Sequence, residues 1–207
     1  MYAQEIKPYL LPILRDLHGD AAQCIDFNTV DVTTLPHSKI IFTGPSCPPF
    51  STMGKQMGKK DARTFVFENI KKLIVYSAHH KCLLMFMIEN VMGIIQRAGG
   101  LTVSYAELLK EKLLQELPDG WRVEIQFRSA ADSGYPTGRK RVFIIGVSPH
   151  LIQAAVANQV TPFTMVPQIP VQPLSDFLDD PFIEEELEPS VLDPDEQFKK
   201  DWNASRI

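Results

Sequence analysis

Residues 39–51 read KIIFTGPSCPPFS, and this stretch decides which fold and which kind of site the chain can have. Its first half is a short apolar run closed by Gly44, a pattern typical of a buried strand. Its second half sets Cys47 among three prolines, which restrict the backbone and lack an N–H donor. The stretch therefore predicts a strand followed by a stiff loop that holds one thiol in place. Such a loop suits a nucleophile, and it also suits an ordinary rigid turn.

Strands and helices alternate on both sides of this stretch. The apolar patterns predict strands at residues 22–26, 39–44, 82–90, 121–129 and 141–147, and helices at residues 4–17, 62–77 and 102–117. Such alternation is typical of an α/β domain with a mostly parallel sheet and flanking helices. In these sheets, functional residues gather at the carboxyl ends of the strands.

The composition changes near residue 150. Residues 1–150 carry 18 Lys and Arg against 14 Asp and Glu, whereas residues 151–207 carry 3 against 11. The mildly basic first part could meet a polyanion such as nucleic acid. The second part is rich in proline and acid and has little periodicity, so we interpret it as an extended arm with one short turn near residues 174–178.

Several classes of protein are disfavoured by what the sequence lacks. It has no run of 18 or more apolar residues, which argues against a membrane-spanning helix and against a membrane partner. Its start has no basic segment followed by an apolar core, so we expect an intracellular protein, nuclear in a eukaryote and cytoplasmic in a bacterium. The three cysteines have no paired spacing, which argues against a disulfide framework and against a metal site.

Reactive side chains fall at three predicted strand ends. Cys47 follows the first strand end, Glu89 and Asn90 close the strand at 82–90, and Arg139 and Arg141 precede the last strand. Each has an ordinary structural explanation: a small buried thiol, an acid beside a helix start, and a solvated basic loop. Their spacing alone supports only the hypothesis of a cysteine-dependent enzyme.

The order of the motifs is more specific than any one of them. GPSCPPFS, then MIENVMG, then AADSGYPTGRKRVFIIG resembles the cytosine-C5 DNA methyltransferases. That family has a GPPCQ-x-FS loop, an ENV strand end and a PQ-x-R-x-R segment that runs into VFIIG. The similarity includes DARTFVFENIKKLI and extends from Tyr2 to about residue 185. It implies a Rossmann-like methyltransferase sheet, S-adenosylmethionine as the cofactor and double-stranded DNA as the substrate.

The resemblance also implies roles for the reactive residues. Cys47 would attack C6 of a cytosine flipped out of the duplex, and Glu89 would hydrogen-bond the pyrimidine edge at N3. Arg139 and Arg141 would complete the catalytic group, since a guanidinium suits fixed contacts with phosphate or a base oxygen.

Cofactor and DNA contacts follow from the same resemblance. Asp26 matches an acid near the adenine of the cofactor, with Asp31 as the alternative, and Pro45 and Ser46 would lie along the methyl-donor side. The expected DNA-binding residues are Ser51, Lys55, Asn90 and Thr137.

The chain also departs from the family pattern. Ser46 and Pro48 replace a proline and a glutamine of the cysteine loop, and Thr137 with Gly138 replaces a Gln-Asn pair. No glycine-rich turn precedes Tyr2. We therefore expect a sheet truncated at both ends, with residues 22–26 as an unprotected edge.

The resulting domain prediction is a partial catalytic domain at residues 1–150 and an acidic, proline-rich extension at 151–207 that leads toward a missing target-recognition region. We expect the isolated chain to be inactive. It would be a fragment, a relic or one part of a split enzyme with a complementing methyltransferase subunit.

Three other functions stay open at this point. One branch of the family methylates tRNA, but it tends to carry Thr where Ser51 stands, which favours DNA. A non-catalytic binding module would explain Ser46, Pro48 and Thr137, but not the four retained reactive groups. A hydrolase or redox protein would need a histidine placed as a base for the thiol, and the sequence offers none there.

Overall fold

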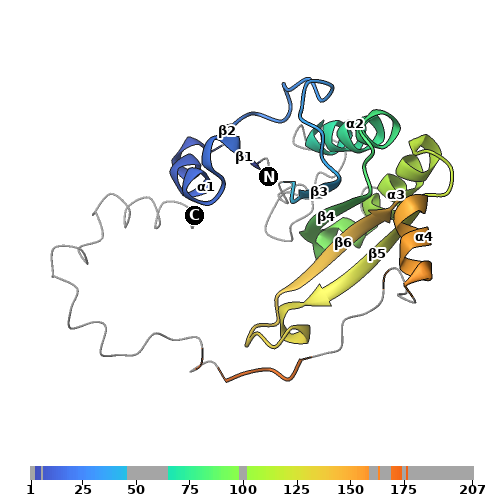
Figure 1. Ribbon diagram of the computed structural model, residues 1–207. Coiled ribbons are helices and arrows are strands. Elements are labelled where there is room, and N and C mark those ends of the chain that lie inside the picture. Colours follow the sequence, from blue (N-terminus) through green and yellow to red (C-terminus); the bar gives the residue numbers. More distant parts are fainter. Residues whose placement is uncertain are drawn as a thin grey trace.

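The computed structural model describes residues 3–5, 7–45, 65–97, 102–158, 163, 169–173 and 176 (Figure 1). The strands are β1 (Ala3–Glu5), β2 (Ala22–Cys24), β3 (Ile40–Thr43), β4 (Met85–Val91), β5 (Arg122–Ser129) and β6 (Lys140–Val147). The helices are α1 (Leu11–His18), α2 (Phe65–His80), α3 (Tyr105–Glu116) and α4 (Pro149–Ala157). Short 3-10 turns lie at η1 (Pro8–Leu10), η2 (Gly19–Ala21), η5 (Met92–Ile95) and η6 (Ala130–Asp132).

Four strands form one mixed sheet in the order β3-β4-β6-β5. β3 and β4 are parallel, whereas β6 is antiparallel to both β4 and β5. The expectation of a mostly parallel sheet was therefore wrong for these strands. The reason is local: β5 and β6 are joined by a short turn that contains η6, so the chain reverses without the crossover helix that parallel neighbours need (Figure 1).

The N-terminal segment forms a separate two-stranded parallel sheet, in which β1 pairs with β2. A helix was expected over residues 4–17, but the α-helix begins at Leu11. Pro8 explains the difference, because proline has no N–H for an intrahelical hydrogen bond and disfavours helical angles in the residue before it. The strand predicted at residues 22–26 is shorter than expected, and β1 covers one of its edges.

The core lies between α2, α3 and one face of the four-stranded sheet. Along β4, buried and half-buried residues alternate, so Phe86, Ile88 and Asn90 point into the core. Met85, Met87 and Glu89 point to the opposite side, which we name the outer face. The fully buried apolar side chains include Phe67, Ile74, Phe86, Ile88, Ile94, Leu113, Ile144 and Val142. The inner face of the sheet thus builds the core, whereas Glu89, the acid predicted as catalytic, lies on the outer face.

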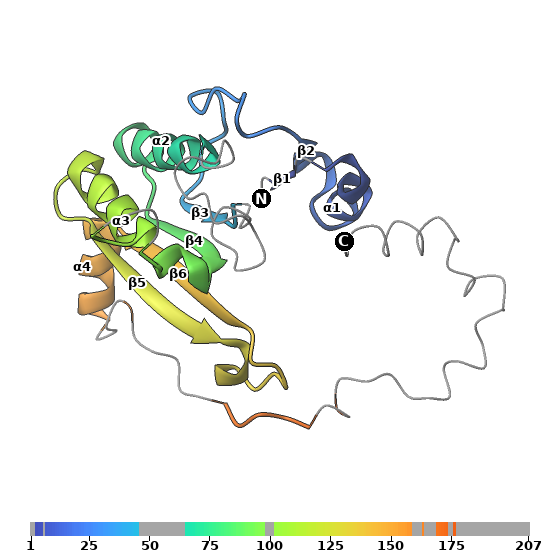
Figure 2. The same ribbon diagram turned by 180° about the vertical axis from the view of Figure 1, so that it is seen from behind.

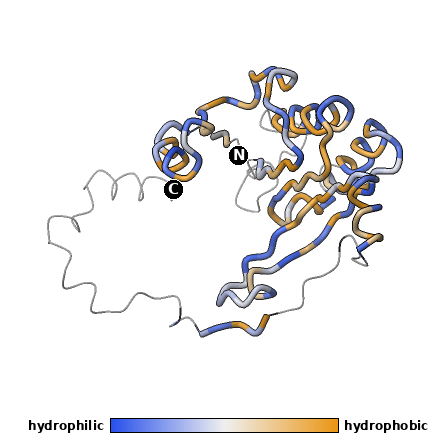
Figure 3. The backbone as a smooth tube through the Cα atoms, viewed as in Figure 1, coloured by the Kyte–Doolittle hydropathy of each residue, from blue (hydrophilic) through white to orange (hydrophobic). Residues whose placement is uncertain are grey.

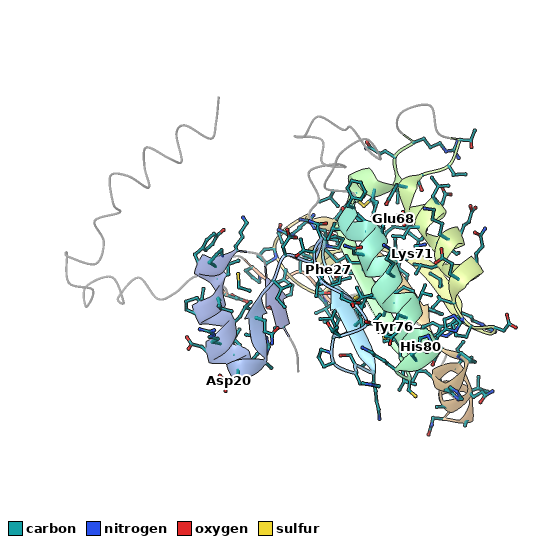
Figure 4. All side chains as sticks on the ribbon, turned by 90° about the horizontal axis from the view of Figure 1, so that it is seen from above. Asp20, Phe27, Glu68, Lys71, Tyr76 and His80 are labelled. Atoms are coloured by element: carbon teal, nitrogen blue, oxygen red, sulfur yellow. The ribbon has the colours of Figure 1, made fainter. Side chains whose placement is uncertain are left out.

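Ion pairs join α2 to α3 beside this core; Figure 4 labels the two members on α2, Glu68 and Lys71. Lys71 of α2 is buried and contacts Glu116 of α3, and Lys112 of α3 lies 3.0 Å from Glu68 of α2. Burial raises the pKa of Glu68, but the hydrogen bond and charge of Lys112 outweigh it, and the pKa lies below its ordinary value. These contacts hold the two helices together on one side of the sheet.

The connection between β2 and β3 is fastened to α2 at two places. Near the start of α2, the Asn69 amide donates to the carbonyls of Phe27, at 3.0 Å, and Asn28. Just after α2, the buried ammonium of Lys81 donates to the carbonyls of Thr33 and Leu35. Figure 4 shows Phe27 beside α2. The residues around Asp26 are therefore positioned by side chains of a helix more than forty positions later.

Helix α4 was not foreseen, because the apolar periodicity after Val147 is weak. The Ser148 hydroxyl accepts a hydrogen bond from the Leu151 amide, and Pro149 stands at the first helical position. This Ser-Pro pair is a recognised start signal for a helix. No helix in the part of the chain that the structure describes has the length and apolar character needed to cross a membrane.

Gly146 provides a direct test of the core packing. A Cβ added there would lie 2.0 Å from Cε1 of Phe86, whose ring is buried and stacked 5.9 Å from that of Trp121. Because the ring cannot move aside freely, we expect Gly146→Ala to lower the free energy of unfolding by about 1–3 kcal/mol in urea denaturation.

Gly138→Ala is the matched control, since nothing lies within 4 Å of the added atom. It should change the stability by no more than about 0.5 kcal/mol. Equal stability of the two variants would show that the packing around Phe86 is looser than described.

Candidate active site

Glu89 lies at the carboxyl end of β4, on the outer face, between β3 and β6. Its neighbour on β6 is Arg141, which stands two positions before Phe143, the direct partner of Glu89. Diagonal residues of neighbouring strands share a face and lie within reach of long side chains. The Arg141 Nε lies 2.8 Å from Glu89 Oε1, and both side chains keep some exposure to solvent. The pair therefore holds a carboxylate in a fixed position at an accessible sheet end.

Gly44 brings β3 close to this carboxylate. It directly follows β3, and a Cβ at Gly44 would lie 3.3 Å from Oε2 of Glu89. Any side chain there would press on the acid, so glycine leaves the room in which Glu89 sits. The sequence analysis treated Gly44 only as the end of a strand. A glycine between a strand and a proline-rich loop was the available signal for close approach.

Asn90 links the start of the cysteine loop to β4. Its side chain points away from Glu89 and is almost fully buried, with 2% of its surface exposed. The amide nitrogen donates to the carbonyl of Pro45 at 3.1 Å, and the amide oxygen accepts from the Val91 backbone at 2.9 Å. This geometry favours a positioning role for Asn90 over the DNA contact expected from sequence. It places Pro45 beside the strand that carries Glu89.

Arg139 and Thr137 lie in the turn between β5 and β6, and both are exposed. The turn is ordered by backbone hydrogen bonds, including Ala130 N–H to the Arg139 carbonyl at 3.0 Å and Thr137 N–H to the Tyr135 carbonyl at 2.8 Å. Figure 3 shows hydrophilic residues along this end of β5 and β6. Arg139 therefore extends into solvent, whereas Arg141 is paired with Glu89.

Asp26 lies in the turn after β2, on a different segment from Glu89 and Arg141. Its Oδ1 accepts hydrogen bonds from the backbone and the side chain of Asn28, at 2.9 and 3.0 Å. Asp31 makes the same kind of turn with Thr33, and the backbone hydrogen bond from Thr33 lowers the pKa of Asp31. Both acids thus order the connection to β3.

Four predicted site residues, Cys47, Ser46, Ser51 and Lys55, lie outside the described residues. Pro45 is the last described residue before them, and it is buried. Cys47 follows Pro45 by two positions in the sequence. The structure therefore brings together Glu89, Arg141, Asn90 and the residue at which the cysteine loop begins.

Among the described residues, no group of three or more His, Cys, Asp or Glu side chains could hold a metal. A carboxylate such as that of Asp26 can accept a hydrogen bond from an exocyclic amine, as an adenine ring requires. The residues predicted for S-adenosylmethionine are thus chemically compatible with it.

Comparison with known proteins gives the assignment. A family model described as C-5 cytosine-specific DNA methylase matches residues 1–203. The chain belongs to this family. The Glu89–Arg141 pair thus lies in a member of the family that the sequence motifs had indicated.

Curated relatives of this chain include bacterial methyltransferases. The type II methyltransferase M.NlaX of Neisseria lactamica is 27% identical over 150 residues, which cover 72% of this chain and 45% of the relative. The type II methyltransferase M.NgoBI of Neisseria gonorrhoeae is 31% identical over 126 residues, which cover 61% and 37%. The chain therefore spans less than half the length of these relatives.

Solved structures confirm the α/β fold. The chain matches the methyltransferase EhMeth of Entamoeba histolytica with a TM-score of 0.58 at 17% identity, over 92% of this chain and 55% of that one. It matches the S. pombe Dnmt2 methyltransferase with a TM-score of 0.53 at 23% identity, over 72% and 42%.

Proposed function

We propose that this chain carries the catalytic centre of a DNA cytosine-5 methyltransferase. The observation that supports the proposal most is the junction at the ends of β3 and β4. There, Arg141 holds the Glu89 carboxylate at 2.8 Å, and Asn90 holds the first residue of the cysteine loop. A nucleophile loop and an oriented acid are the two protein groups that this reaction needs from the chain.

In the proposed reaction, the Cys47 thiolate adds to C6 of a cytosine flipped out of the duplex. The C5–C6 double bond then supplies an electron pair at C5. Glu89 shares a proton with N3 of the pyrimidine, so that the negative charge which develops on the ring as the thiolate adds is neutralised there. After C5 has gained a methyl group, a base removes the C5 proton, the double bond re-forms and the thiolate leaves from C6. The Cys47 thiolate thus opens and closes the adduct.

In this proposal, Arg141 positions Glu89, and both Arg141 and Arg139 contact the substrate. Arg141 keeps Glu89 in one orientation, and its remaining N–H groups stay available to a base oxygen, apart from the one that donates to the Lys140 carbonyl. The exposed Arg139 is proposed to bind a phosphate. Further DNA contacts are proposed from Ser51, Lys55 and Thr137.

S-adenosylmethionine, when bound, supplies an electrophilic methyl group. We propose that Asp26, Pro45 and Ser46 hold it. Pro45 is buried, and its carbonyl accepts a hydrogen bond from Asn90 of β4. This position supports the proposed cofactor contact, because Asn90 directly follows Glu89 in the sequence.

The organisation of the chain is part of the proposal. Residues 1–150 are proposed as a partial catalytic domain and residues 151–207 as an extension toward a target-recognition region. Since the chain spans 45% of M.NlaX and 37% of M.NgoBI, we propose that activity requires further polypeptide, either in the same chain or from a complementing methyltransferase subunit.

The test uses the native assembly purified from its source cells. It is incubated with S-adenosylmethionine labelled on the methyl group, and label is counted in duplex DNA and, separately, in tRNA. We expect label in DNA, recovered as 5-methylcytosine, and none from residues 1–207 alone. Label found only in tRNA would show that the substrate is RNA and not DNA. No label in either would contradict an enzymatic function.

A further inference from the structure

Arg128 lies on β5 directly opposite Arg141 of β6, the arginine that holds Glu89. Residues that face each other across paired strands point to the same side of the sheet, so Arg128 belongs to the outer face, as Glu89 does. In this sheet β6 lies between β5 and β4. Because neighbouring strands are about 4.8 Å apart, the backbone at Arg128 is about 10 Å from that of β4. Arg128 therefore stands close to the proposed site.

The end of the sheet that carries Arg128 is accessible. Figure 1 and Figure 2 both show the ends of β5 and β6 at their shared turn extending away from α2, α3 and α4. Arg128 is partly exposed, and Arg139 in the adjoining turn is exposed. A large molecule bound at Glu89 can therefore reach both arginines.

Uncharged groups hold the guanidinium of Arg128 in place. Its Nη2 donates to Oε1 of Gln126 at 2.9 Å, and its Nη1 donates to the Phe127 carbonyl at 3.2 Å. The Gln126 amide in turn donates to the carbonyl of Phe163 at 3.4 Å. Because these acceptors are uncharged, their bonds orient the guanidinium without neutralising it. An oriented guanidinium suits a phosphate, whose oxygens match the geometry of its N–H groups.

The pairing of Arg128 with Arg141 is electrostatically unfavourable. Like charges directly opposite each other on neighbouring strands destabilise a sheet. An anion placed beside both guanidinium groups would offset the repulsion between them. The phosphates of a nucleic acid bound at this end of the sheet are such anions, so their binding and the strand pair would stabilise each other.

We propose that Arg128 binds a DNA backbone phosphate next to the flipped cytosine. The proposal rests on the proposed function, in which the cytosine lies at Glu89 and Arg139 binds a phosphate. Phosphate contacts position a protein on DNA and carry no sequence information directly. Arg128 thus strengthens DNA binding and takes no part in the transfer of the methyl group.

The test measures binding of a labelled DNA duplex to the native assembly by fluorescence anisotropy at several salt concentrations. Arg128→Gln is expected to raise Kd at least about fivefold and to lower the slope of log Kd against log salt by about 0.9, the value for one phosphate contact. Arg128→Lys keeps the charge, so it should keep the slope. In methyl transfer, Arg128→Gln should raise the KM for DNA and leave kcat within about twofold.

Arg122→Gln is the matched control. Arg122 is an exposed arginine on the same side of the same strand, and it lies about 20 Å along β5 from Arg128. The substitution removes the same charge. We expect Kd to stay within about twofold and the salt slope to stay unchanged.

An unchanged Kd in Arg128→Gln would overturn the proposal. So would equal losses in Arg128→Gln and Arg122→Gln, because the general charge of the sheet would then explain the binding. A loss shared by Arg128→Lys with an unchanged salt slope would show that the role is structural, and a loss seen with tRNA alone would exclude the DNA contact.

The same measurements separate this proposal from the proposed function. Unchanged DNA binding by Arg128→Gln, in an assembly that methylates DNA, would count against the Arg128 contact alone. Weakened binding with the reduced salt slope, in an assembly that transfers no methyl group, would support the contact and count against the enzymatic function.

Discussion

Cys47→Ser is expected to reduce methyl transfer by the native assembly at least about 10³-fold, because a hydroxyl cannot replace the thiolate as the nucleophile at neutral pH. The loss should appear in the chemical step. Binding of duplex DNA, measured by fluorescence anisotropy, should change little, since the substitution alters one atom and no charge of the neutral side chain.

A covalent trap separates this expectation from general damage. Duplex DNA that contains 5-fluorocytosine keeps the adduct, because fluorine cannot leave C5 as a proton does. The unchanged assembly should form a protein–DNA band that survives denaturing electrophoresis, and Cys47→Ser should not. Cys24→Ser and Cys82→Ser are matched controls, as both cysteines are exposed, and both variants should keep the band. A band that persists in Cys47→Ser and disappears in Cys82→Ser would show that Cys82, and not Cys47, is the nucleophile.

Glu89→Gln is expected to lower kcat by about 10²–10⁴-fold, the range for loss of an acid–base group. Glutamine keeps nearly the same shape and can still accept a hydrogen bond from Arg141, but it has no carboxyl proton to exchange with N3 of the ring. The structural consequence should be small, because the ion pair is partly exposed. Steady-state rates of methyl transfer at saturating DNA measure the effect.

Glu124→Gln is the control for charge alone. Glu124 is exposed and faces the same side of the sheet as Glu89, being the register partner of Ile145 on β6. Its substitution removes the same charge without touching Arg141, and kcat should stay within about twofold. If both variants lost the same activity, the charge of the outer face would matter, and the position of Glu89 would not.

The register of the strands explains why the site was partly predictable. Glu89 and Arg141 could be proposed from motif order, and their contact then follows from the antiparallel pairing of β4 with β6. The same pairing could not be foreseen from apolar runs, which look alike in parallel and antiparallel strands. This is why a mostly parallel sheet was expected and a mixed sheet found. The role of Asn90 was hidden for a related reason, since a buried amide and a DNA-binding amide have the same sequence signal.

The sequence by itself determined the family, the order of the strands along the chain and the identity of the reactive groups, because these depend on residue types and their spacing. Only the tertiary structure decided which of them meet. Arg141 reaches Glu89 because two strands fifty residues apart share a register, and Asn90 reaches Pro45 because β3 lies beside β4. Pairing between distant segments depends on the packing of the whole core, and no local pattern specifies it.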